Sequence, residues 1–342
     1  LALLVRPADT IALRGDLGAG KTSFARFLIG ALRGAGTPSG EEEIASPTFA
    51  LVQDYDTPRM AIAHFDLYRL RDESELEEIG FLDASRRALV LVEWPERAGT
   101  ALPADRLEVS LGETPDPATR HVTVTGLGAT APRVRRLDEI QTFLADAGWQ
   151  DADAAYLQGD ASQRAYARLR HGDGRRAILM DAPRQPDGPA VRDGLAYSRI
   201  AHLAEDVRPF VAIAGRLLRA GLSAPKVLAG DLDRGLVLLE DLGDGVFGAL
   251  VRGGAAARQR ELWTAALDTL VALRTAAPSF VCPLPGGDCQ TVPRLDRPIL
   301  EIETELLPTW YWPHSKGAPI PAQILAAYTA LWSPLIDRLI AE

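Results

Sequence analysis

The sequence is poor in cysteine and has no long apolar run, and each shortage excludes a class of protein. Two cysteines, Cys282 and Cys289, are too few for a disulfide scaffold and lack the spacing of a metal site. We expect two reduced thiols in a cytoplasmic protein. No apolar run approaches the roughly 20 residues that a membrane span needs. The net charge of −9 argues against a protein whose surface as a whole binds a polyanion such as a nucleic acid.

Both ends of the sequence look cut. The first residue is Leu rather than Met, and the opening LALLV is too short for a signal peptide. The last residues, DRLIAE, resemble the middle of a helix. The length of 342 residues favours two domains over one core. We therefore expect two domains within a longer protein.

The pattern along the chain predicts domains of two kinds. Across residues 1–128, β-rich runs alternate with helical stretches, which predicts an α/β domain; the runs are TIALR, FALVQDY, AIAHFD, ALVLVE, LEVSLG and HVTVTG. Residues 129–136 are small, basic and proline-bearing, and are predicted to be a linker. Residues 137–342 carry strand and helix patterns in a different order and predict a second, α+β domain.

Lysine is the other scarce residue, and its placement is informative. Only three lysines occur against 34 arginines, and one of them, Lys21, lies in GDLGAGKT. Residues 15–22 match G-x-x-x-x-G-K-[ST] between a predicted strand and a predicted helix. In such a loop, backbone N–H groups and the helix N-terminus bind phosphates. The compact ammonium of Lys21 suits the β- and γ-phosphate oxygens, and Thr22 offers a hydroxyl ligand for Mg²⁺.

The nucleotide is predicted to be ATP. GTPases read guanine with an N-K-x-D loop, and neither Lys226 nor Lys316 lies in one. The helix after the loop is predicted to pack on the sheet through one face, which comprises Phe24, Phe27, Leu28, Ala31 and Leu32.

Two predicted strands end in acids. AIAHFD ends at Asp66 and ALVLVE ends at Glu93. A P-loop enzyme needs carboxylates at strand ends to hold Mg²⁺ and to orient water. We therefore predict Lys21, Asp66 and Glu93 as catalytic residues, with Thr22, Asp66 and Glu93 as metal ligands. The alternative is that both acids are merely solvated strand ends.

Five segments occur in the order and spacing of one family: GDLGAGKTS, SPTF (46–49), HFDLYRL (64–70), ELEEIG (75–80) and EWPER (93–97). Over residues 1–128 the chain thus resembles TsaE, the P-loop ATPase of bacterial threonylcarbamoyladenosine tRNA modification. The resemblance implies an ATPase that binds the other protein subunits of the modification complex and meets tRNA only indirectly.

The resemblance also implies residue roles. Asp66 corresponds to the Walker B aspartate, and Glu93 binds magnesium or positions water. Thr48, with Ser46, lies on a loop that senses the γ-phosphate. Trp94 either reports the nucleotide state or packs beside Pro95. The nucleotide is held by Gly15, Asp16, Leu17, Gly18, Ala19, Gly20, Lys21, Thr22 and Ser23. His64 is predicted to be a packed strand residue rather than a catalytic base.

The second half resembles a different family. LQGDASQRAYARL (157–169), AILMDAP (177–183) and APKVLAGDLDRGLVLLEDLGD (224–244) are similar to aminoglycoside-phosphotransferase-like kinases. More narrowly, they resemble the N-acetylmuramate/N-acetylglucosamine kinases. The resemblance implies a protein-kinase-like fold, a nucleotide loop containing Ser162, and a hinge at which Glu240 and Leu242 meet adenine. It also implies an amino sugar substrate.

The second half departs from that pattern. The third kinase strand carries no lysine, for which Arg175 or Arg176 could substitute, and no H-x-D-x-x-x-x-N follows residue 137. We expect a domain cut before its catalytic loop and inactive as it stands. The aromatic run 310–312 is predicted to be packed core rather than a sugar platform.

Two other functions stay open from the sequence. One is a P-loop small-molecule kinase, although residues 71–125 show no arginine-rich lid. The other is an ATPase whose second half only docks other proteins. No internal arginine finger is evident, with Arg69 and Arg97 as weak candidates, so we expect turnover to be slow alone and faster with partners.

Overall fold

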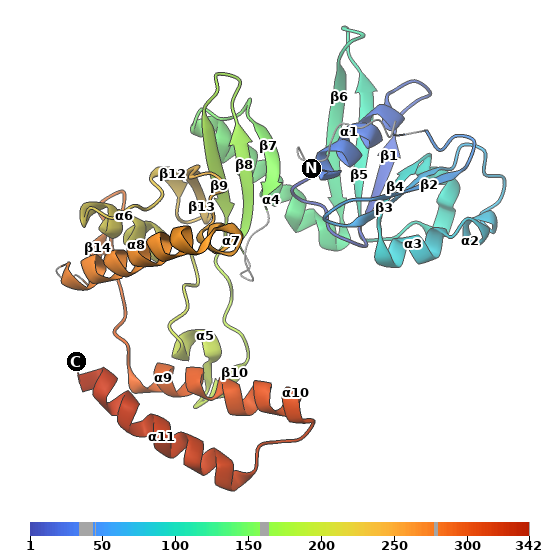
Figure 1. The fold of residues 1–342 in the computed structure, drawn as a ribbon. Coiled ribbons are helices and arrows are strands. Elements are labelled where there is room, and N and C mark those ends of the chain that lie inside the picture. Colours follow the sequence, from blue (N-terminus) through green and yellow to red (C-terminus); the bar gives the residue numbers. More distant parts are fainter. Residues whose placement is uncertain (34–43, 45, 158–163, 277–279, 342) are drawn as a thin grey trace. The chain divides into compact units, whose positions relative to one another are not determined.

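The computed structural model describes residues 1–33, 44, 46–157, 164–276 and 280–341. It consists of two compact units, residues 1–161 with 165–178 and residues 162–164 with 179–342. Figure 1 shows the elements of both.

A six-stranded sheet of order β2-β3-β4-β1-β5-β6 organises the first 127 residues. The central strands β3, β4, β1 and β5 run parallel, and the edge strands β2 and β6 pair antiparallel with their neighbours. The strands are β1 (Thr10–Arg14), β2 (Val52–Asp56), β3 (Ala61–Asp66), β4 (Leu89–Glu93), β5 (Arg106–Glu113) and β6 (Arg120–Leu127). The expected α/β domain is confirmed, and each β-rich run contains a strand, although in FALVQDY the strand begins only at Val52.

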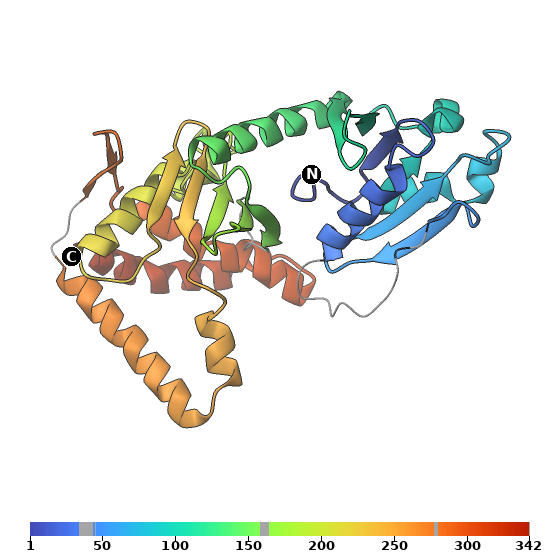
Figure 2. The ribbon, with the colours of Figure 1, turned by 90° about the horizontal axis from the view of Figure 1, so that it is seen from above.

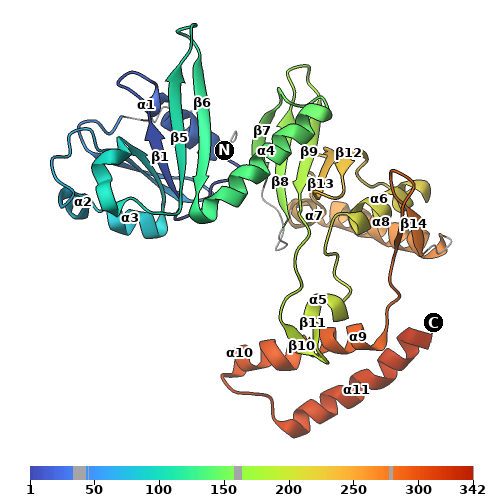
Figure 3. The same ribbon diagram turned by 180° about the vertical axis from the view of Figure 1, so that it is seen from behind.

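Helices cover both faces of this sheet because side chains alternate between the faces along each strand. In β1, Leu13 packs into the core beneath α1 (Lys21–Arg33), whereas Ala12 belongs to the opposite core. Residues of α2 (Glu75–Glu78) and α3 (Phe81–Arg87) close that opposite core. The two sides can be compared in Figures 1 and 3.

The buried face of α1 differs from the predicted one. The apolar residues that α1 buries are Ala25, Leu28, Ile29 and Leu32. Phe27 is 79% exposed, and Ala31 is also exposed. The prediction for Phe27 and Ala31 was wrong because the buried stripe follows Ala25 and Ile29 beside Leu28 and Leu32, so the helix is turned by about one residue from the predicted face.

The segment expected as a linker is helical in the structure. After the 3₁₀ turn η2 (Gly128–Thr130), residues 131–136 form the start of α4 (Ala131–Asp146), which runs uninterrupted in Figure 2. Both Nη atoms of Arg133 donate to the Asp9 carboxylate at 2.7 Å, and Val134 packs against the core beneath α1. Proline suits the first turn of a helix. Pro132, which suggested a linker in the sequence, therefore lies in the first turn of α4.

A second sheet has the order β12-β13-β9-β8-β7, in which β7–β8 and β12–β13 are antiparallel pairs. Helix α6 (Arg208–Arg219) lies between β9 and β12 in the chain. The strands are β7 (Asp153–Leu157), β8 (Ala165–Arg170), β9 (Arg176–Asp181), β12 (Val227–Asp231) and β13 (Leu236–Glu240). This mixture of strand and helix agrees with a second α and β region.

The elements from residue 190 onward are mostly helices. Helices α7 and α8 form a hairpin in which the rings of Phe247 and Trp263 meet edge to face, 5.2 Å apart. Tyr328 of α11 donates to the Thr304 carbonyl of α9 at 2.8 Å. These elements are β10 (Ala190–Arg192), β11 (Leu195–Ala196), α5 (Tyr197–Ile200), α7 (Phe247–Gly253), α8 (Ala256–Thr275), β14 (Val281–Pro283), β15 (Cys289–Thr291), α9 (Arg297–Thr304), the π-helix η3 (Leu307–Tyr311), α10 (Trp312–Lys316) and α11 (Ala322–Ala341).

Several apolar side chains of these helices are exposed. Trp310 is 71% exposed and Tyr311 is 65% exposed, so the prediction of packed core was wrong for both. Among the described helices, α11 is long and apolar enough to cross a membrane by length and composition alone, which is weak evidence for a span. Pro334, Asp337 and Arg338 interrupt its apolar sequence.

Candidate functional site

The loop between β1 and α1 has backbone conformations that favour glycine. Gly15, Gly18 and Gly20 have φ values of 142°, 85° and 99°. At Gly15 there is also no room, because an added Cβ would lie 2.7 Å from the carbonyl oxygen of Leu111 in β5. Strand β5 therefore presses against the loop, and only glycine fits there without strain.

Lys21 is the first residue of α1 and its side chain is held within the loop. Its Nζ donates to the carbonyl oxygens of Gly15 and Asp16, at 2.6 and 2.9 Å. The same atom lies 3.9 Å from the ring centroid of Trp94, which is a cation–π distance. The ammonium is thus buried, and it is positioned by two carbonyls of the loop on one side and by the ring of Trp94, after β4, on the other.

Thr22 reaches the end of β4. Its Oγ1 donates to Glu93 Oε2 at 3.0 Å, although the two residues are 71 positions apart. The other carboxylate oxygen, Oε1, is 3.0 Å from Nε2 of His64. Glu93 and His64 are both buried. The strand-end acid is therefore tied to the P-loop hydroxyl and is not a solvated end.

Asp66 is joined in the same way to the segment SPTF. Thr48 Oγ1 donates to Asp66 Oδ2 at 2.8 Å, and Thr48 in turn is 2.7 Å from the hydroxyl of Ser46. The Tyr68 backbone N–H donates to Asp66 Oδ1 at 3.1 Å. In the sheet, Asp66 is paired in register with Glu93, so the two acids lie on neighbouring strands.

Trp94 has a strained backbone conformation. Its φ of 59° lies in the left-handed region, which bulky residues rarely adopt. The ring stacks at a tilt on Tyr68, with 5.1 Å between centroids, and faces Lys21. Strain of this kind persists where surrounding contacts enforce it and is concentrated at functional sites.

Ion pairs brace the strand that leads into the loop. Arg14, the last residue of β1, donates to Glu108 of β5 at 3.0 Å, and Arg106 donates to the same oxygen at 2.8 Å. These hydrogen bonds, that of Arg14 first, lower the pKa of the Glu108 carboxyl. The pair stays ionised at neutral pH and fixes β1 against β5.

The arginine that contacts the P-loop is Arg120, which was not among the candidates named from the sequence; Arg69, which was, contacts Phe49. The guanidinium of Arg69 lies over the ring of Phe49, at 4.6 Å. Arg120, in the β5–β6 hairpin, donates from Nε to the Ala19 carbonyl oxygen at 3.2 Å. Sequence reasoning missed Arg120 because it is 101 positions from Ala19 and lies in no local motif.

The P-loop, the ends of β3 and β4 and the segment SPTF together line a cavity of about 340 Å³. Ten of the predicted residues line it: Leu17, Gly18, Gly20, Lys21, Thr22, Ser23, Thr48, Asp66, Glu93 and Trp94. Gly15, Asp16 and Ala19 form the loop but do not line the cavity. Tyr68 lines it and was missed, although its place two residues after Asp66 in HFDLYRL was an available signal.

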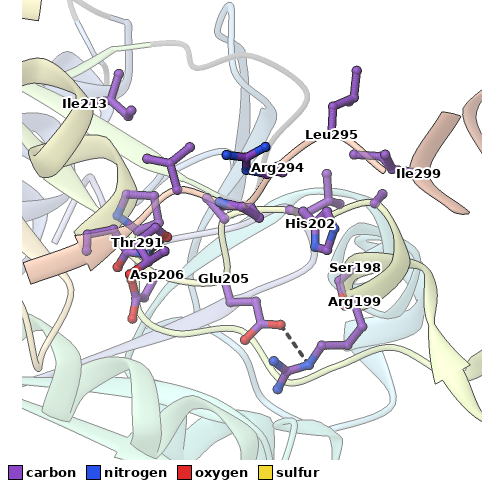
Figure 4. Close-up of a pocket in the computed structure, with 17 residues that line it drawn as sticks. Ser198, Arg199, His202, Glu205, Asp206, Ile213, Thr291, Arg294, Leu295 and Ile299 are labelled. Atoms are coloured by element: carbon purple, nitrogen blue, oxygen red, sulfur yellow. Dashed lines mark hydrogen bonds and ion pairs between the residues drawn. The ribbon is translucent and has the colours of Figure 1, made fainter. Parts of the chain in front are cut away.

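The second unit has a cavity of its own, of about 660 Å³. It is lined by residues between 198 and 213, from α5 to α6, and by residues between 290 and 299, from β15 to α9, with Arg199, His202, Glu205 and Arg294 among its polar side chains (Figure 4). Arg199 Nε is 3.2 Å from Glu205 Oε1. The lining combines apolar side chains with acidic and basic ones.

Of the predicted kinase residues, the two that the structure describes, Glu240 and Leu242, do not line that cavity. Glu240 Oε2 accepts from the Lys226 backbone N–H at 3.2 Å, and Leu242 is exposed. Ser162 lies outside the described residues. Arg175, a proposed substitute for the kinase lysine, pairs with Asp173 at 2.7 Å and lies over the Trp149 ring.

Comparison with known proteins agrees with this geometry. Residues 1–122 match the family described as Threonylcarbamoyl adenosine biosynthesis protein TsaE. The TsaE of Rickettsia bellii is 42% identical over 110 residues, which are 32% of this chain and 73% of that protein. The chain belongs to the TsaE family. The TsaE of Rickettsia felis is 43% identical over 111 residues, 62% of its length.

The second half has relatives of another kind. The N-acetylmuramate/N-acetylglucosamine kinase of Caulobacter vibrioides is 39% identical over 204 residues, which are 56% of this chain and 54% of that protein. The chain therefore joins a TsaE domain to a region homologous to these kinases. It spans about half the length of the kinases that it matches.

A solved structure also matches part of the chain. The crystal structure of Bacillus subtilis YdiB covers 41% of this chain and 82% of its own, with 27% sequence identity and a TM-score of 0.32.

Proposed function

We propose that the first domain hydrolyses ATP with Mg²⁺ and supports threonylcarbamoylation of a tRNA adenosine next to the anticodon. The observation that carries this proposal is the hydrogen bond between Thr22 of the P-loop and Glu93 at the end of β4, beside the buried ammonium of Lys21. Thr22, Asp66 and Glu93 would serve as metal ligands, with Lys21, Asp66 and Glu93 as the catalytic groups. TsaE relatives support the biological role.

The donor set fits Mg²⁺. Two buried carboxylates and one hydroxyl line a single cavity, and Mg²⁺ is usually bound through one or two carboxylates together with substrate phosphates. When bound there, Mg²⁺ would neutralise charge on the phosphate oxygens. Thr22, Asp66 and Glu93 are the residues that would hold it.

The chain's own residues have distinct tasks in this proposal. The N–H groups of residues 15–23 would bind phosphate, favoured by the N-terminus of α1. Lys21 would leave the carbonyls of Gly15 and Asp16 for the β- and γ-phosphate oxygens, and so stabilise charge that builds up during in-line attack by water. Glu93 or Asp66 would orient the water. Thr48 would sense the γ-phosphate through its bond to Asp66.

Partners are expected to set the rate. The acidic chain is suited to protein partners in the cytoplasm, and tRNA would be met only through them. Arg69 is engaged with Phe49, and Arg120 contacts a carbonyl on the loop. An arginine finger is therefore expected from another subunit, which would raise turnover above that of the isolated chain.

For the second region we propose a phosphotransferase-like module with an amino sugar as substrate, by homology to the kinases. Without an H-x-D-x-x-x-x-N pattern after residue 137, the 342 residues by themselves are not expected to transfer phosphate. A docking module is the alternative, and a P-loop small-molecule kinase is the alternative for the first domain. Phosphorylation of an amino sugar by this chain would contradict the expectation for the second region.

Nucleotide binding is tested by calorimetry with ADP and ATP in the presence of Mg²⁺. Lys21→Ala is predicted to weaken binding by about 10- to 100-fold, because a charged hydrogen bond contributes about 1.5–3 kcal/mol. Lys316→Ala, in α10, is the matched control and is predicted to leave binding unchanged. Equal affinity of the Lys21→Ala variant and the wild type would contradict the proposed site.

Coupling to partners is tested by measuring ATP turnover with and without the other subunits of the modification complex. We expect turnover to rise when they are added. Equal rates in both conditions would show that the ATPase is not coupled to that complex, even if nucleotide binding requires Lys21.

A further inference from the structure

We infer that His64 is a positioning residue, which holds the Glu93 carboxylate in the orientation that the metal and Thr22 require. The inference rests on the proposed Mg-ATP site and assigns a task to a side chain that strand packing alone does not explain. His64 acts through Glu93 and does not touch the nucleotide.

The sheet register places His64 where it can reach Glu93. Residues Ile62, His64 and Asp66 alternate onto one face of β3, and Ile62 packs into the core beneath α1. Asp66 pairs with Glu93 and His64 pairs with Leu91. His64 is thus the diagonal neighbour of Glu93 on the α1 face, and a long side chain can span that diagonal.

The two oxygens of Glu93 are divided between two donors. Oε2 accepts from Thr22 Oγ1, and Oε1 is 3.0 Å from His64 Nε2. A carboxylate only accepts, so we assign the hydrogen of the imidazole to Nε2. With one donor on each oxygen, the carboxylate plane cannot turn without breaking a buried hydrogen bond.

A purely structural role for this ring is a poor explanation. His64 is 0% exposed, and its Nδ1 is buried and finds no partner among the described residues. Burying a polar ring with one unpaired nitrogen costs stability that Leu or Phe would not cost at the same position. The bond to Glu93 is the contact that an apolar residue could not make.

A catalytic base is excluded by position. Glu93 lines the cavity of about 340 Å³, but His64 does not and is fully buried behind it. Water or phosphate in the cavity would meet Glu93 first. Residues that hold a ligand's side chain in place usually affect metal affinity or activity about 10- to 100-fold when removed.

The test uses two pairs of variants in the full chain. His64→Leu removes the donor and keeps an apolar fill. His64→Gln places an amide nitrogen near the position of Nε2, whereas His64→Asn is too short to do so. Thr10→Val is the control for the same sheet, because Thr10 Oγ1 is also buried and finds no partner among the described residues.

The readout is ADP affinity by calorimetry with Mg²⁺ and with EDTA, together with the thermal unfolding midpoint. We expect His64→Leu and His64→Asn to reduce the gain in affinity due to Mg²⁺ by about 10- to 100-fold. Binding in EDTA is expected to stay within about twofold of the wild type, because the P-loop contacts remain. His64→Gln is expected to recover most of the gain, and Thr10→Val all of it.

Two outcomes of the Mg²⁺ comparison would overturn the inference. One is an unchanged Mg²⁺ gain in folded His64→Leu, and the other is an equal loss in His64→Gln and His64→Asn. A wild-type chain that binds ADP equally with Mg²⁺ and EDTA would overturn the proposed metal site itself. Loss of binding in EDTA by a folded variant would indicate distortion of the P-loop and would likewise count against positioning through Glu93.

Discussion

At the residue scale, the candidate site depends on polar side chains whose partners come from distant strands. Thr22 binds Glu93, and Thr48 binds Asp66. Lys21 is held by loop carbonyls and by the face of Trp94. Each of these contacts is buried or partly buried, so the loss of one partner leaves the other unsatisfied.

A pH prediction concerns Asp173, in the turn between β8 and β9. The Arg175 backbone N–H, and then its guanidinium, lower the pKa of the Asp173 carboxyl to about 2. Because the pKa is lowered on folding, the ionised Asp173 carboxylate stabilises the turn at pH values above its ordinary pKa of 3.8. This stabilisation is lost as the pH falls from 3.8 toward about 2. Carboxyl NMR titration would measure it.

The substitution Arg175→Ala separates the two causes. We expect the pKa of Asp173 to rise but to remain below its ordinary value, because the backbone N–H donor stays. Arg176→Ala is the control and is expected to leave the pKa of Asp173 unchanged. A pKa for Asp173 near the ordinary value in the wild type would contradict the turn geometry.

At the scale of elements, the P-loop depends on the strand beside it as well as on its own sequence. Leu111 of β5 leaves no space for a side chain at Gly15, and Arg120 of the β5–β6 hairpin contacts the loop at Ala19. The loop is thus held from outside by a hairpin about 100 residues later in the sequence.

Two glycine substitutions are predicted to act in opposite directions. Gly15→Ala places Cβ 2.7 Å from the Leu111 carbonyl oxygen at a φ of 142°, so we expect nucleotide binding to be lost and stability to fall by about 1–3 kcal/mol. Gly30→Ala, in α1 with open space around its Cβ, is expected to stabilise the chain by about 0.5–1 kcal/mol.

Urea unfolding and calorimetry with ADP would measure both effects. Gly30→Ala serves as the control for adding a methyl group in the same element. Normal ADP affinity in Gly15→Ala would contradict the crowding of Gly15 by Leu111. A lower free energy of unfolding in Gly30→Ala would contradict the open space at Gly30.

At the scale of the whole molecule, α4 extends the TsaE domain beyond the part that the family match covers. The match ends at residue 122, yet Arg133 pairs with Asp9 ahead of β1, and Thr130 Oγ1 donates to the Arg106 carbonyl. The first residues of this helix therefore pack with the TsaE domain.

We predict that a fragment of residues 1–146 is more stable than a fragment of residues 1–127, by about 2 kcal/mol. A part-buried bidentate ion pair contributes about 1.5–3 kcal/mol, and Val134 adds apolar burial. Urea unfolding of the two fragments would measure the difference, and Arg133→Ala in the longer fragment should remove most of it. Equal stability of the two fragments would show that α4 is only a connection.

The sequence by itself determined the features that depend on near neighbours. The P-loop, the six strands around it, and the acids at the ends of β3 and β4 follow from local spacing and alternation, because those patterns act over a few residues. Two family resemblances, both supported by the comparisons, were visible in short motifs, one set in each half of the chain.

Only the tertiary structure decided which of these residues meet. The face of α1, the start of α4 before residue 137, the exposure of Trp310 and Tyr311, and the contacts of Tyr68 and Arg120 at the site all depend on packing between distant segments. The bond from His64 to Glu93 joins residues 29 positions apart across two strands. Strand register sets such contacts, and register is a property of the folded sheet rather than of either segment.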